Sequence, residues 1–509
     1  MEESRTSNSI KNISASIIYQ LLNFILSFVS RSIFIQVLGV GYLGINGLFN
    51  DVLSMLNLAE LGFGTAMTYS MYKPLAEKDY KTLAGLTQFY KKVYRIIALS
   101  IAGIGIILVP FLHNLVNLEQ DIPNLEIYYL LFLASNVASY LVTYKTTVMY
   151  ADQKNYILVK YTAYWSIAQT LVLTIVLFLT HSYIIYLCCQ VAFVYASNFQ
   201  KSYVAQKKYP FIGEKVKLPK EKTKGIFKDV SSAFLYKIAN VLITATDNTL
   251  ISVIVSTEMV GFYSNYQIVT ARLGTIVSTV FSSLITSLGN LLVNENEERR
   301  FQVFQIMQSL SLILSTFFVS CIFLLQEDFI RVWLGEDFVL GLLPLSAIVF
   351  NFYFSISIMP ITAFREAAGL FRKTKFIMLW TAFFNLVLSV LFGKMIGLAG
   401  ILFATSISKL LTSFWYEPSL LFKEYFKKPC RLYFLQMVKG AAITGVTILV
   451  SGLVSHWMIP GNWVELILKG VVVSAVSLTI TLLSYHRTLG FKLLADKAKS
   501  ILLGIKKLR

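Results

Sequence analysis

Charged side chains inside long apolar runs are the residues of this sequence best suited to chemistry. Arg31, Asp51, Asp247 and Arg272 each lie well within such a run. A charge at the centre of a bilayer costs at least about 2.5 to 3.5 kcal/mol, so intramembrane charges are rare and mark sites for ligands or ions. Two arginines would attract an anionic group, and two aspartates would tune that site or exchange protons.

The polar residues around these charges follow helical spacing. Residues at intervals of three and four share one face of a helix, and four predicted helices carry such a polar stripe. The stripes are Ser16, Gln20, Asn23, Ser27 and Arg31; Asn46, Asn50, Ser54, Asn57 and Glu60; Lys237, Asn240, Thr244 and Asp247; and Asn265, Arg272, Thr275, Thr279 and Ser282. Four helices therefore face something other than lipid.

Depth along the helices suggests how the charges are paired. At a rise of about 1.5 Å per residue, Arg31 and Asp51 lie roughly 12 to 13 Å from the turn near residue 40. Asp247 and Arg272 lie roughly 15 to 18 Å from the turn between the predicted helices 226–255 and 259–293. Each hairpin would then hold one acid and one base. These pairs would either lock the hairpins structurally or form part of a ligand site.

The ligand-site interpretation names a specific set of residues. Arg31, Lys237 and Arg272 would form a cationic floor for an anionic headgroup, and Asp51, Asp247 and Glu60 would tune it. Asn23 and Asn240 would add polar contacts, although such residues also form hydrogen bonds between membrane helices. Lys409 either belongs to the site or extends its amine to the membrane surface.

A glycine motif between the first two apolar runs imitates a nucleotide site. Gly39, Gly41 and Gly44 spell G-x-G-x-x-G, with Glu60 about twenty residues on. A dinucleotide site requires a strand before the glycines and a βαβ unit around them, whereas both flanking runs here have membrane length. The motif therefore predicts a tight turn at which two helices approach closely.

Composition indicates a membrane protein. Of the 509 residues, 56% are hydrophobic and only 14% are charged, and the mean hydropathy is +0.65; soluble domains carry about 25% charged residues. The four cysteines form no C-x-x-C pair or Cys/His cluster, so neither a metal site nor a disulfide framework is expected. The sequence also has no G-x-x-x-x-G-K-[ST] loop for ATP.

Apolar runs of membrane length occur about fourteen times. The predicted helices cover 12–38, 42–72, 82–113, 124–150, 156–180, 183–205, 226–255, 259–293, 301–326, 337–367, 374–395, 397–424, 431–457 and 462–484. Loops after even-numbered helices are rich in Lys and Arg, which stay on the cytoplasmic side, so both termini are predicted to be cytoplasmic. Topology and attraction to anionic lipids account for the net charge of +18 without nucleic-acid binding.

An internal repeat divides the chain. At an offset of 217 residues the segment from Gln20 falls on that from Lys237, Tyr42 falls on Met259, and Ala151 falls on Ala368. The predicted fold is an all-α polytopic membrane protein with two parallel six-helix lobes around a central cavity. The predicted parts are an N-lobe (1–206), a basic cytoplasmic linker (207–225), a C-lobe (226–428), two further helices (429–486) and a basic amphipathic cytoplasmic tail (487–509).

Several segments resemble a known family. LGVGYLGINGLF (38–49), AELGFGTAMTYSMY (59–72), MVGFY (259–263) and REAAGLFRKTKF (365–376) are similar to segments of polysaccharide export flippases. These Wzx-like proteins belong to the multidrug/oligosaccharidyl-lipid/polysaccharide (MOP) superfamily. The resemblance implies a flippase in the bacterial cytoplasmic membrane that moves undecaprenyl-pyrophosphate-linked oligosaccharide repeat units outward by alternating access, for capsule, O-antigen or related glycans.

The resemblance also carries expectations for site residues and partners. Basic residues in helices one, seven and eight would hold the headgroup, matched here by Arg31, Lys237 and Arg272, while helix two departs from the family in carrying Asp51 and Glu60. The expected partners are the lipid-linked oligosaccharide, anionic membrane lipids, and a glycan polymerase with its assembly proteins. No cofactor is expected, and proton or sodium coupling stays open.

Other functions also remain open. A flippase for teichoic acid or a peptidoglycan precursor would need a similar site. A cation-coupled drug exporter would favour acidic and aromatic cavity residues and twelve helices. A membrane glycosyltransferase or polymerase would need a large outer loop or clustered carboxylates, and the short outer loops here favour a protein that is not an enzyme.

Overall fold

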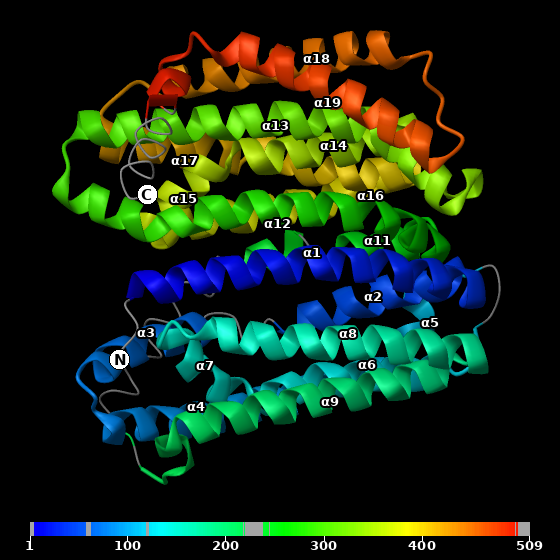
Figure 1. Ribbon diagram of the computed structural model, residues 1–509, viewed down its shortest axis with the longest axis vertical. Coiled ribbons are helices and arrows are strands. Elements are labelled where there is room, and N and C mark those ends of the chain that lie inside the picture. Colours follow the sequence, from blue (N-terminus) through cyan, green and yellow to red (C-terminus); the bar gives the residue numbers. More distant parts are fainter. Residues whose placement is uncertain are drawn as a thin grey trace. The chain divides into compact units, whose positions relative to one another are not determined.

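Helices form nearly all of the regular structure that is described. The computed structural model describes residues 5–57, 63–118, 122–216, 218, 238–243, 245–493 and 495–496. Glu60, Lys237, part of the linker 207–225 and most of the tail 487–509 lie outside the described residues. Within those residues the regular elements are helical and no strand occurs (Figure 1), which confirms the predicted all-α fold class.

The chain divides into two compact units, Met1–Gly261 and Phe262–Arg509. The boundary falls inside a helix, α12, so the first unit contains residues beyond the predicted N-lobe. Residues 238–243 are helical, and the α-helices with both ends in the described part that begin in unit 1 are α1 (Arg5–Leu38), α2 (Val40–Leu56), α3 (Phe63–Ala76), α4 (Tyr80–Leu108), α5 (Leu112–Leu115), α6 (Leu125–Tyr140), α7 (Thr143–Ala151), α8 (Asn155–Thr180), α9 (Tyr183–Lys208), α11 (Asp247–Ile254) and α12 (Thr257–Asn294).

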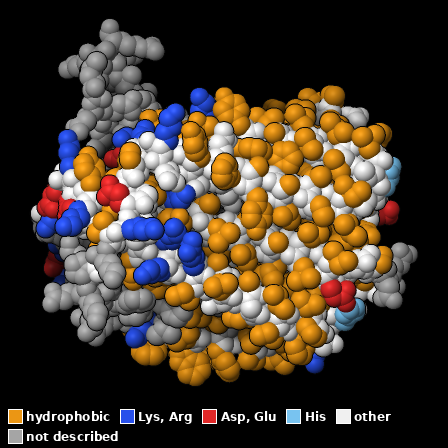
Figure 2. Space-filling model, turned by 90° about the horizontal axis from the view of Figure 1, so that it is seen from below, with side chains coloured by type: hydrophobic (Ala, Val, Ile, Leu, Met, Phe, Trp, Pro, Cys, Tyr) orange, Lys and Arg blue, Asp and Glu red, His pale blue; other side chains and the backbone are white. Residues whose placement is uncertain are grey.

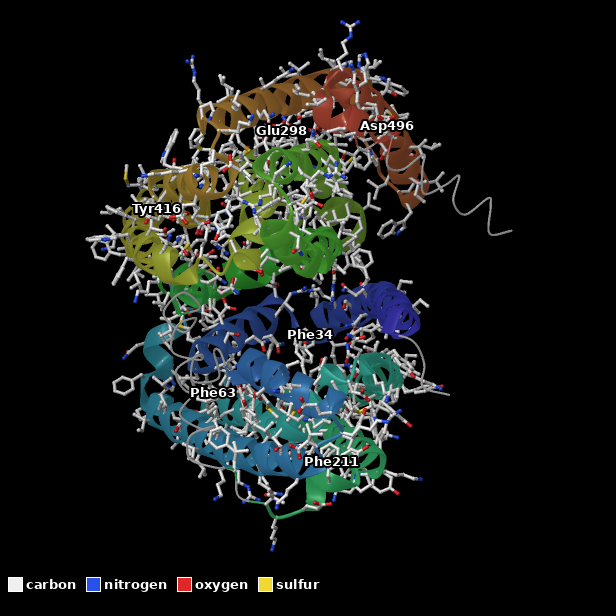
Figure 3. The ribbon with its side chains drawn as sticks, turned by 90° about the vertical axis from the view of Figure 1, so that its left-hand side faces the viewer. Phe34, Phe63, Phe211, Glu298, Tyr416 and Asp496 are labelled. Atoms are coloured by element: carbon white, nitrogen blue, oxygen red, sulfur yellow. The ribbon has the colours of Figure 1, made fainter. Side chains whose placement is uncertain are left out.

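Long helices pack side by side in unit 1. Helix α1 lies along α8, and α9 packs against both α6 and α8. Their apolar faces enclose a core rich in aromatic side chains, which includes the buried Phe34 and Phe211 (Figure 3). Phe34 makes an edge-on ring contact with Tyr183, at 5.8 Å between centroids. These contacts fix the faces that α1, α8 and α9 turn toward one another.

Unit 2 contains the rest of α12 and seven further α-helices in its described part. These are α13 (Glu297–Leu334), α14 (Leu342–Ser357), α15 (Met359–Ala367), α16 (Phe371–Leu411), α17 (Ser413–Leu421), α18 (Arg431–Ser455) and α19 (Trp463–Tyr485). Helix α13 packs against α14, α18 and α19. Polar contacts reinforce the seam, with the Thr316 and Thr444 hydroxyls 2.9 Å apart and Lys469 paired with Asp328.

Eight stretches of the described chain are long and apolar enough to cross a membrane, or nine if the bent pair α6–α7 counts as one span. One of these stretches, Lys373–Phe426, contains two of the helices expected from the sequence. The chain is therefore a multi-pass membrane protein, and the total of about fourteen spans stays a prediction.

Charge is unevenly distributed over unit 1. Figure 2 shows one face of the molecule on which Lys and Arg side chains gather toward one end and hydrophobic side chains cover most of the rest. Exposed basic residues lie at the start of α4 and at the end of α9, including Lys81, Lys207 and Lys208. Beyond the other end of α4, His113 lies in the α4–α6 connection, 3.7 Å from Glu126 at the start of α6. We call the end with the lysines the basic end of unit 1.

The G-x-G-x-x-G segment forms a turn between helices, as the sequence predicts. Gly39 alone separates α1 from α2 and has a φ of +87°, a conformation that glycine adopts readily. Gly44 has a different role, because a Cβ there would lie 1.9 Å from the Thr257 carbonyl oxygen. The close approach is thus between α2 and the start of α12.

A second glycine turn lies inside α16. Ile396 (φ −133°) and Gly397 (φ +61°, ψ −138°) interrupt the helix and reverse the chain without a loop. The break falls at the boundary between the predicted helices 374–395 and 397–424. A Cβ at Gly400 would lie 2.1 Å from the Phe392 carbonyl oxygen, so the two helical arms approach within backbone distance just beyond the turn.

Candidate functional site

Arg31 lies inside the span Ile18–Leu38 of α1, where its side chain is half-buried. It precedes the end of α1 at Leu38 by seven residues, or about 10 Å of helix. Two other members of its stripe make bonds within α1: the Asn23 amide donates to the Tyr19 hydroxyl at 3.1 Å, and the Ser27 hydroxyl donates to the Asn23 carbonyl at 2.6 Å. Arg31 is the charged member of this stripe.

Asp51 contacts a different helix from the one predicted. Its carboxylate accepts hydrogen bonds from the backbone and the side chain of Asn248 in α11, and no ion pair joins it to Arg31 in the described part of the chain. Gly47, one turn before Asp51, lies against α12 and α11, since a Cβ there would be 2.9 Å from Val260 Cγ1 and 3.8 Å from Asn248 Nδ2. The predicted pairing of Arg31 with Asp51 is therefore wrong, because α2 turns this face toward α11.

The other residues of the predicted set are dispersed. Asp247 is half-buried at the start of α11 and Asn240 is exposed, both in unit 1. Arg272, on α12, and Lys409, two residues before the end of α16 at Leu411, are half-buried in unit 2. The pairing of Asp247 with Arg272 joins residues of different units and stays a prediction. The same holds for the ligand-binding roles of the whole set.

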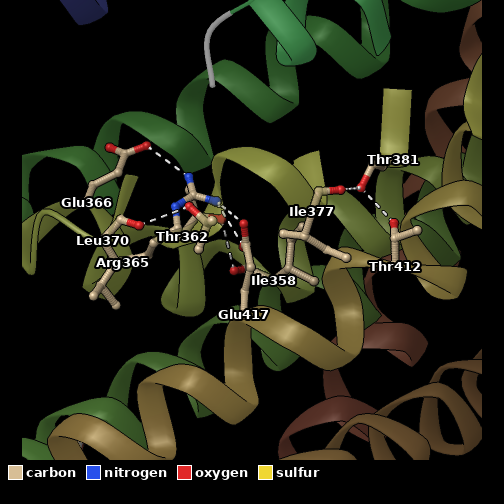
Figure 4. Close-up of polar contacts among 10 residues, drawn as sticks. Ile358, Thr362, Arg365, Glu366, Leu370, Ile377, Thr381, Thr412 and Glu417 are labelled. Atoms are coloured by element: carbon tan, nitrogen blue, oxygen red, sulfur yellow. Dashed lines mark hydrogen bonds and ion pairs between the residues drawn. The ribbon is translucent and has the colours of Figure 1, made fainter. Parts of the chain in front are cut away.

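Unit 2 contains a buried ion pair that the sequence analysis missed. The Arg365 guanidinium donates from one nitrogen to both carboxylate oxygens of Glu417, at 2.8 and 2.9 Å (Figure 4). The two side chains are only 5% and 8% exposed. The other terminal nitrogen of Arg365 lies 3.5 Å from Glu366. Both residues lie in helices that are apolar enough to cross a membrane, Leu342–Ala367 and Lys373–Phe426, and a charge in such a run was the signal available in the sequence.

The ion pair joins two short helices that each follow a break. Helix α15 begins after an interruption at Ile358, and α17 begins after one at Thr412. The Thr412 hydroxyl, at the second break, lies 2.6 Å from that of Thr381 (Figure 4). Helix breaks leave backbone carbonyls without helical partners, and polar side chains gather here beside them.

A matching break occurs in unit 1. Helices α6 and α7 meet at Leu141–Val142 with a bend of 47°. Leu141 precedes Ile358 by 217 residues, the offset that the sequence comparison predicts, and both α7 and α15 are nine residues long. The two units therefore repeat this local feature.

Comparison with solved structures shows which known fold most of the chain shares. No protein-family model and no curated protein matches the sequence. Among solved structures, the lipid II flippase MurJ in an inward closed conformation aligns over 93% of this chain and 99% of its own, with a TM-score of 0.68 and 16% identity.

Transporters of the MOP superfamily also match. An inward-facing multidrug resistance MATE family transporter of this superfamily aligns over 78% of this chain and 93% of its own, with a TM-score of 0.57 and 15% identity. The MATE multidrug transporter DinF-BH aligns over 84% and 96%, with a TM-score of 0.56 and 13% identity. The chain is thus a multi-pass membrane protein with the fold shared by MurJ and the MATE transporters.

Proposed function

We propose that this protein is a flippase that moves undecaprenyl-pyrophosphate-linked oligosaccharide repeat units to the outer leaflet of a bacterial cytoplasmic membrane. The observation that carries the proposal is the likeness to a lipid II flippase over 93% of the chain, with a higher TM-score than the two MATE transporters reach. The mechanism is alternating access, and transport involves no covalent change in the lipid-linked sugar.

Arg31 supports the anionic nature of this substrate. An arginine inside an apolar span is costly and indicates a function, and its guanidinium presents a fork of donors that fits phosphate oxygens. An inside-negative potential favours outward movement of each negative charge by about 2.3 kcal/mol per 100 mV. We infer that Arg31 contacts the pyrophosphate, and that the membrane potential drives export.

A peptidoglycan precursor is the second candidate substrate, because MurJ is a lipid II flippase. Depletion of the protein in its own cells distinguishes the two. We expect lipid-linked repeat units to accumulate on the cytoplasmic leaflet while the cell wall continues to be made. Accumulation of the peptidoglycan precursor would favour the second candidate, and loss of all lipid-linked sugar would indicate an enzyme.

The role of Arg31 has a separate test. Arg31→Ala should abolish surface glycan in a depletion strain, with the protein present at its normal level, because the headgroup loses its deepest cation in α1. Lys92→Ala, at an exposed lysine of α4, is the matched control and should keep glycan near normal. Normal surface glycan in the Arg31 variant would contradict the cationic site.

A further inference from the structure

A polar pocket lies at the bend between α6 and α7 in unit 1. Its volume is about 320 Å³, and its walls come from α1, the α6–α7 bend, α8 and α9. This size is at the lower end of the range of small-molecule sites, about 300 to 1,000 Å³. The lining residues that matter below are Tyr150 on α7, Asn155 on α8, and Asn198 and Lys201 on α9.

The pocket carries one positive charge and no negative charge. Lys201 is the only Lys, Arg, Asp or Glu among its lining residues, and no carboxylate pairs with it among the described contacts. Asp152, in the nearby α7–α8 turn, is bound to Lys154 and to the Tyr209 hydroxyl. A lysine in a polar pocket without an acid partner favours an anionic ligand.

Two amides in the wall each have one buried atom without a hydrogen-bond partner. Asn198 is only 9% exposed, and its Nδ2 has no hydrogen-bond partner. The Oδ1 atom of Asn155, on the neighbouring helix, is also buried and unpartnered. Leaving a buried donor unsatisfied costs about 1 to 3 kcal/mol. Rotation of the Asn198 side chain would bring this amide into the pocket, where a ligand with oxygen acceptors would satisfy it beside Lys201.

The pocket lies toward the basic end of unit 1. Helix α8 begins at Asn155, and Asn198 and Lys201 lie ten and seven residues before the end of α9 at Lys208. At 1.5 Å per residue these side chains are about 10 to 15 Å from the basic end of unit 1. The pocket residues of α9 are therefore nearer to the basic end than to the start of α9 at Tyr183, and lysines at a membrane surface attract anionic groups.

We propose that this pocket binds a phosphate-bearing anion, with Lys201 neutralising its charge and Asn198 donating to a phosphate oxygen. The source of the phosphate is either an anionic phospholipid headgroup or a soluble phosphate ester. No residue of the Arg31 stripe lines this pocket, and its lining residue Tyr19 accepts a hydrogen bond from Asn23 of that stripe. A ligand there would connect α7 to α8 and α9 at the bend.

Native mass spectrometry of the purified full-length protein tests the proposal. The probes are phosphatidylglycerol, zwitterionic phosphatidylcholine, and glycerol 3-phosphate as the soluble anion. The variants are Lys201→Gln and Asn198→Ala, with Lys201→Arg as the charge-preserving change and Lys207→Gln as a matched control on the same helix. Monodisperse elution in size-exclusion chromatography verifies that each variant is folded.

We expect Lys201→Gln to reduce retention of phosphatidylglycerol about tenfold, the usual effect of losing one charged hydrogen bond. Asn198→Ala should reduce it less, while Lys201→Arg and Lys207→Gln should resemble the wild type, and phosphatidylcholine should be unaffected. Lysine-dependent binding of glycerol 3-phosphate instead of the lipid would assign the site to soluble phosphates. Equal retention of both anions in Lys201→Gln and Lys207→Gln would overturn the proposal.

Discussion

The bend between α6 and α7 and the break between α14 and α15 occupy equivalent positions but are stabilised by different chemistry. In unit 2 the short helix α15 is held by the buried pair Arg365–Glu417. The positions 217 residues earlier are Val148, which is buried and apolar, and Gln200, which accepts a hydrogen bond from Trp165. Unit 1 thus replaces the ion pair with an apolar side chain and an amide, and its bend borders the polar pocket instead.

The difference continues at the residues that follow. Tyr209 donates a hydrogen bond to Asp152 at 2.5 Å, whereas its counterpart in unit 2 is Phe426, which packs on Phe304 and Phe364 at 5.1 and 5.3 Å between ring centroids. Unit 2 pairs its buried charges with each other and packs aromatic rings in this region. Unit 1 keeps polar groups available. One helical plan can therefore yield a sealed lobe and a lobe with room for a ligand.

The largest expected effect tests the sealed lobe. Glu417→Ala leaves Arg365 buried without its carboxylate, and removing one partner of a buried pair costs roughly 3 to 5 kcal/mol. We expect this loss in the free energy of unfolding, measured by denaturation of the purified protein. The double change Arg365→Met with Glu417→Leu should recover most of it, because apolar residues of similar volume replace buried pairs well.

The control for this experiment is a second ion pair in the same unit. Lys373 and Glu424 lie 2.5 Å apart, but their side chains are 54% and 29% exposed. Glu424→Gln should change stability by no more than about 1 kcal/mol, as for other exposed pairs. A Glu417→Ala variant as stable as Glu424→Gln would contradict the claim that the buried Arg365–Glu417 pair holds α15 in unit 2.

An intermediate effect is expected where unit 1 depends on close packing rather than on charge. Gly44→Ala places a methyl group against the Thr257 carbonyl, and overpacking of this kind costs roughly 1 to 3 kcal/mol. Gly41→Ala, whose new Cβ would meet only Leu118 and Ile122 at 3.5 and 3.6 Å, should be nearly neutral. Similar melting temperatures for the two variants would show that α2 can move away from α12 freely.

The smallest effect is expected when Tyr209 of unit 1 is replaced by phenylalanine, the residue type of its counterpart in unit 2. Tyr209→Phe removes the hydrogen bond to Asp152 and should lower stability by about 1 kcal/mol near neutral pH. Burial and the Asp152 carboxylate raise the pKa of Tyr209 well above its usual value. The unfolded tyrosine ionises near pH 10, so the wild-type contribution is complete below that pH and is lost as the pH rises further.

Denaturation at pH 8 and at pH 10.5 checks this sign. The stability difference between wild type and Tyr209→Phe should be constant up to about pH 9 and should decrease above pH 10. A difference that grows with pH would mean that the phenolate, not the phenol, is favoured in the folded protein.

The sequence predicted the helical fold because a span requires only a run of apolar residues, and even the hairpin at residue 396 was located from such runs. The breaks at Leu141 and Ile358 were missed, since both residues are apolar and hydropathy does not register backbone geometry. Depth arguments placed Arg31 and Asp51 at one level but gave no direction around the helix axis. In the structure, the orientation of Asp51 around the axis of α2 places its carboxylate against Asn248.

The partner of Arg365 was equally beyond the sequence. Its residue type in an apolar run marks it as unusual, but Glu417 is 52 residues away and several acids are nearer in the chain. Only the packing of α15 on α17 selects it. Candidate charged residues can thus be chosen from the apolar runs that contain them and from the helical spacing of polar residues. Their pairing depends on the rotation and tilt of each helix.

The loopless turn in α16 has a consequence for how freely this region can vary. No atom lies within 4 Å of a Cβ at Gly397, yet its φ of +61° with ψ of −138° is open essentially to glycine alone. At Gly400 the constraint is space, because Phe392 fills it. Saturation mutagenesis of this hairpin would therefore reveal two intolerant positions three residues apart, one for conformational and one for steric reasons.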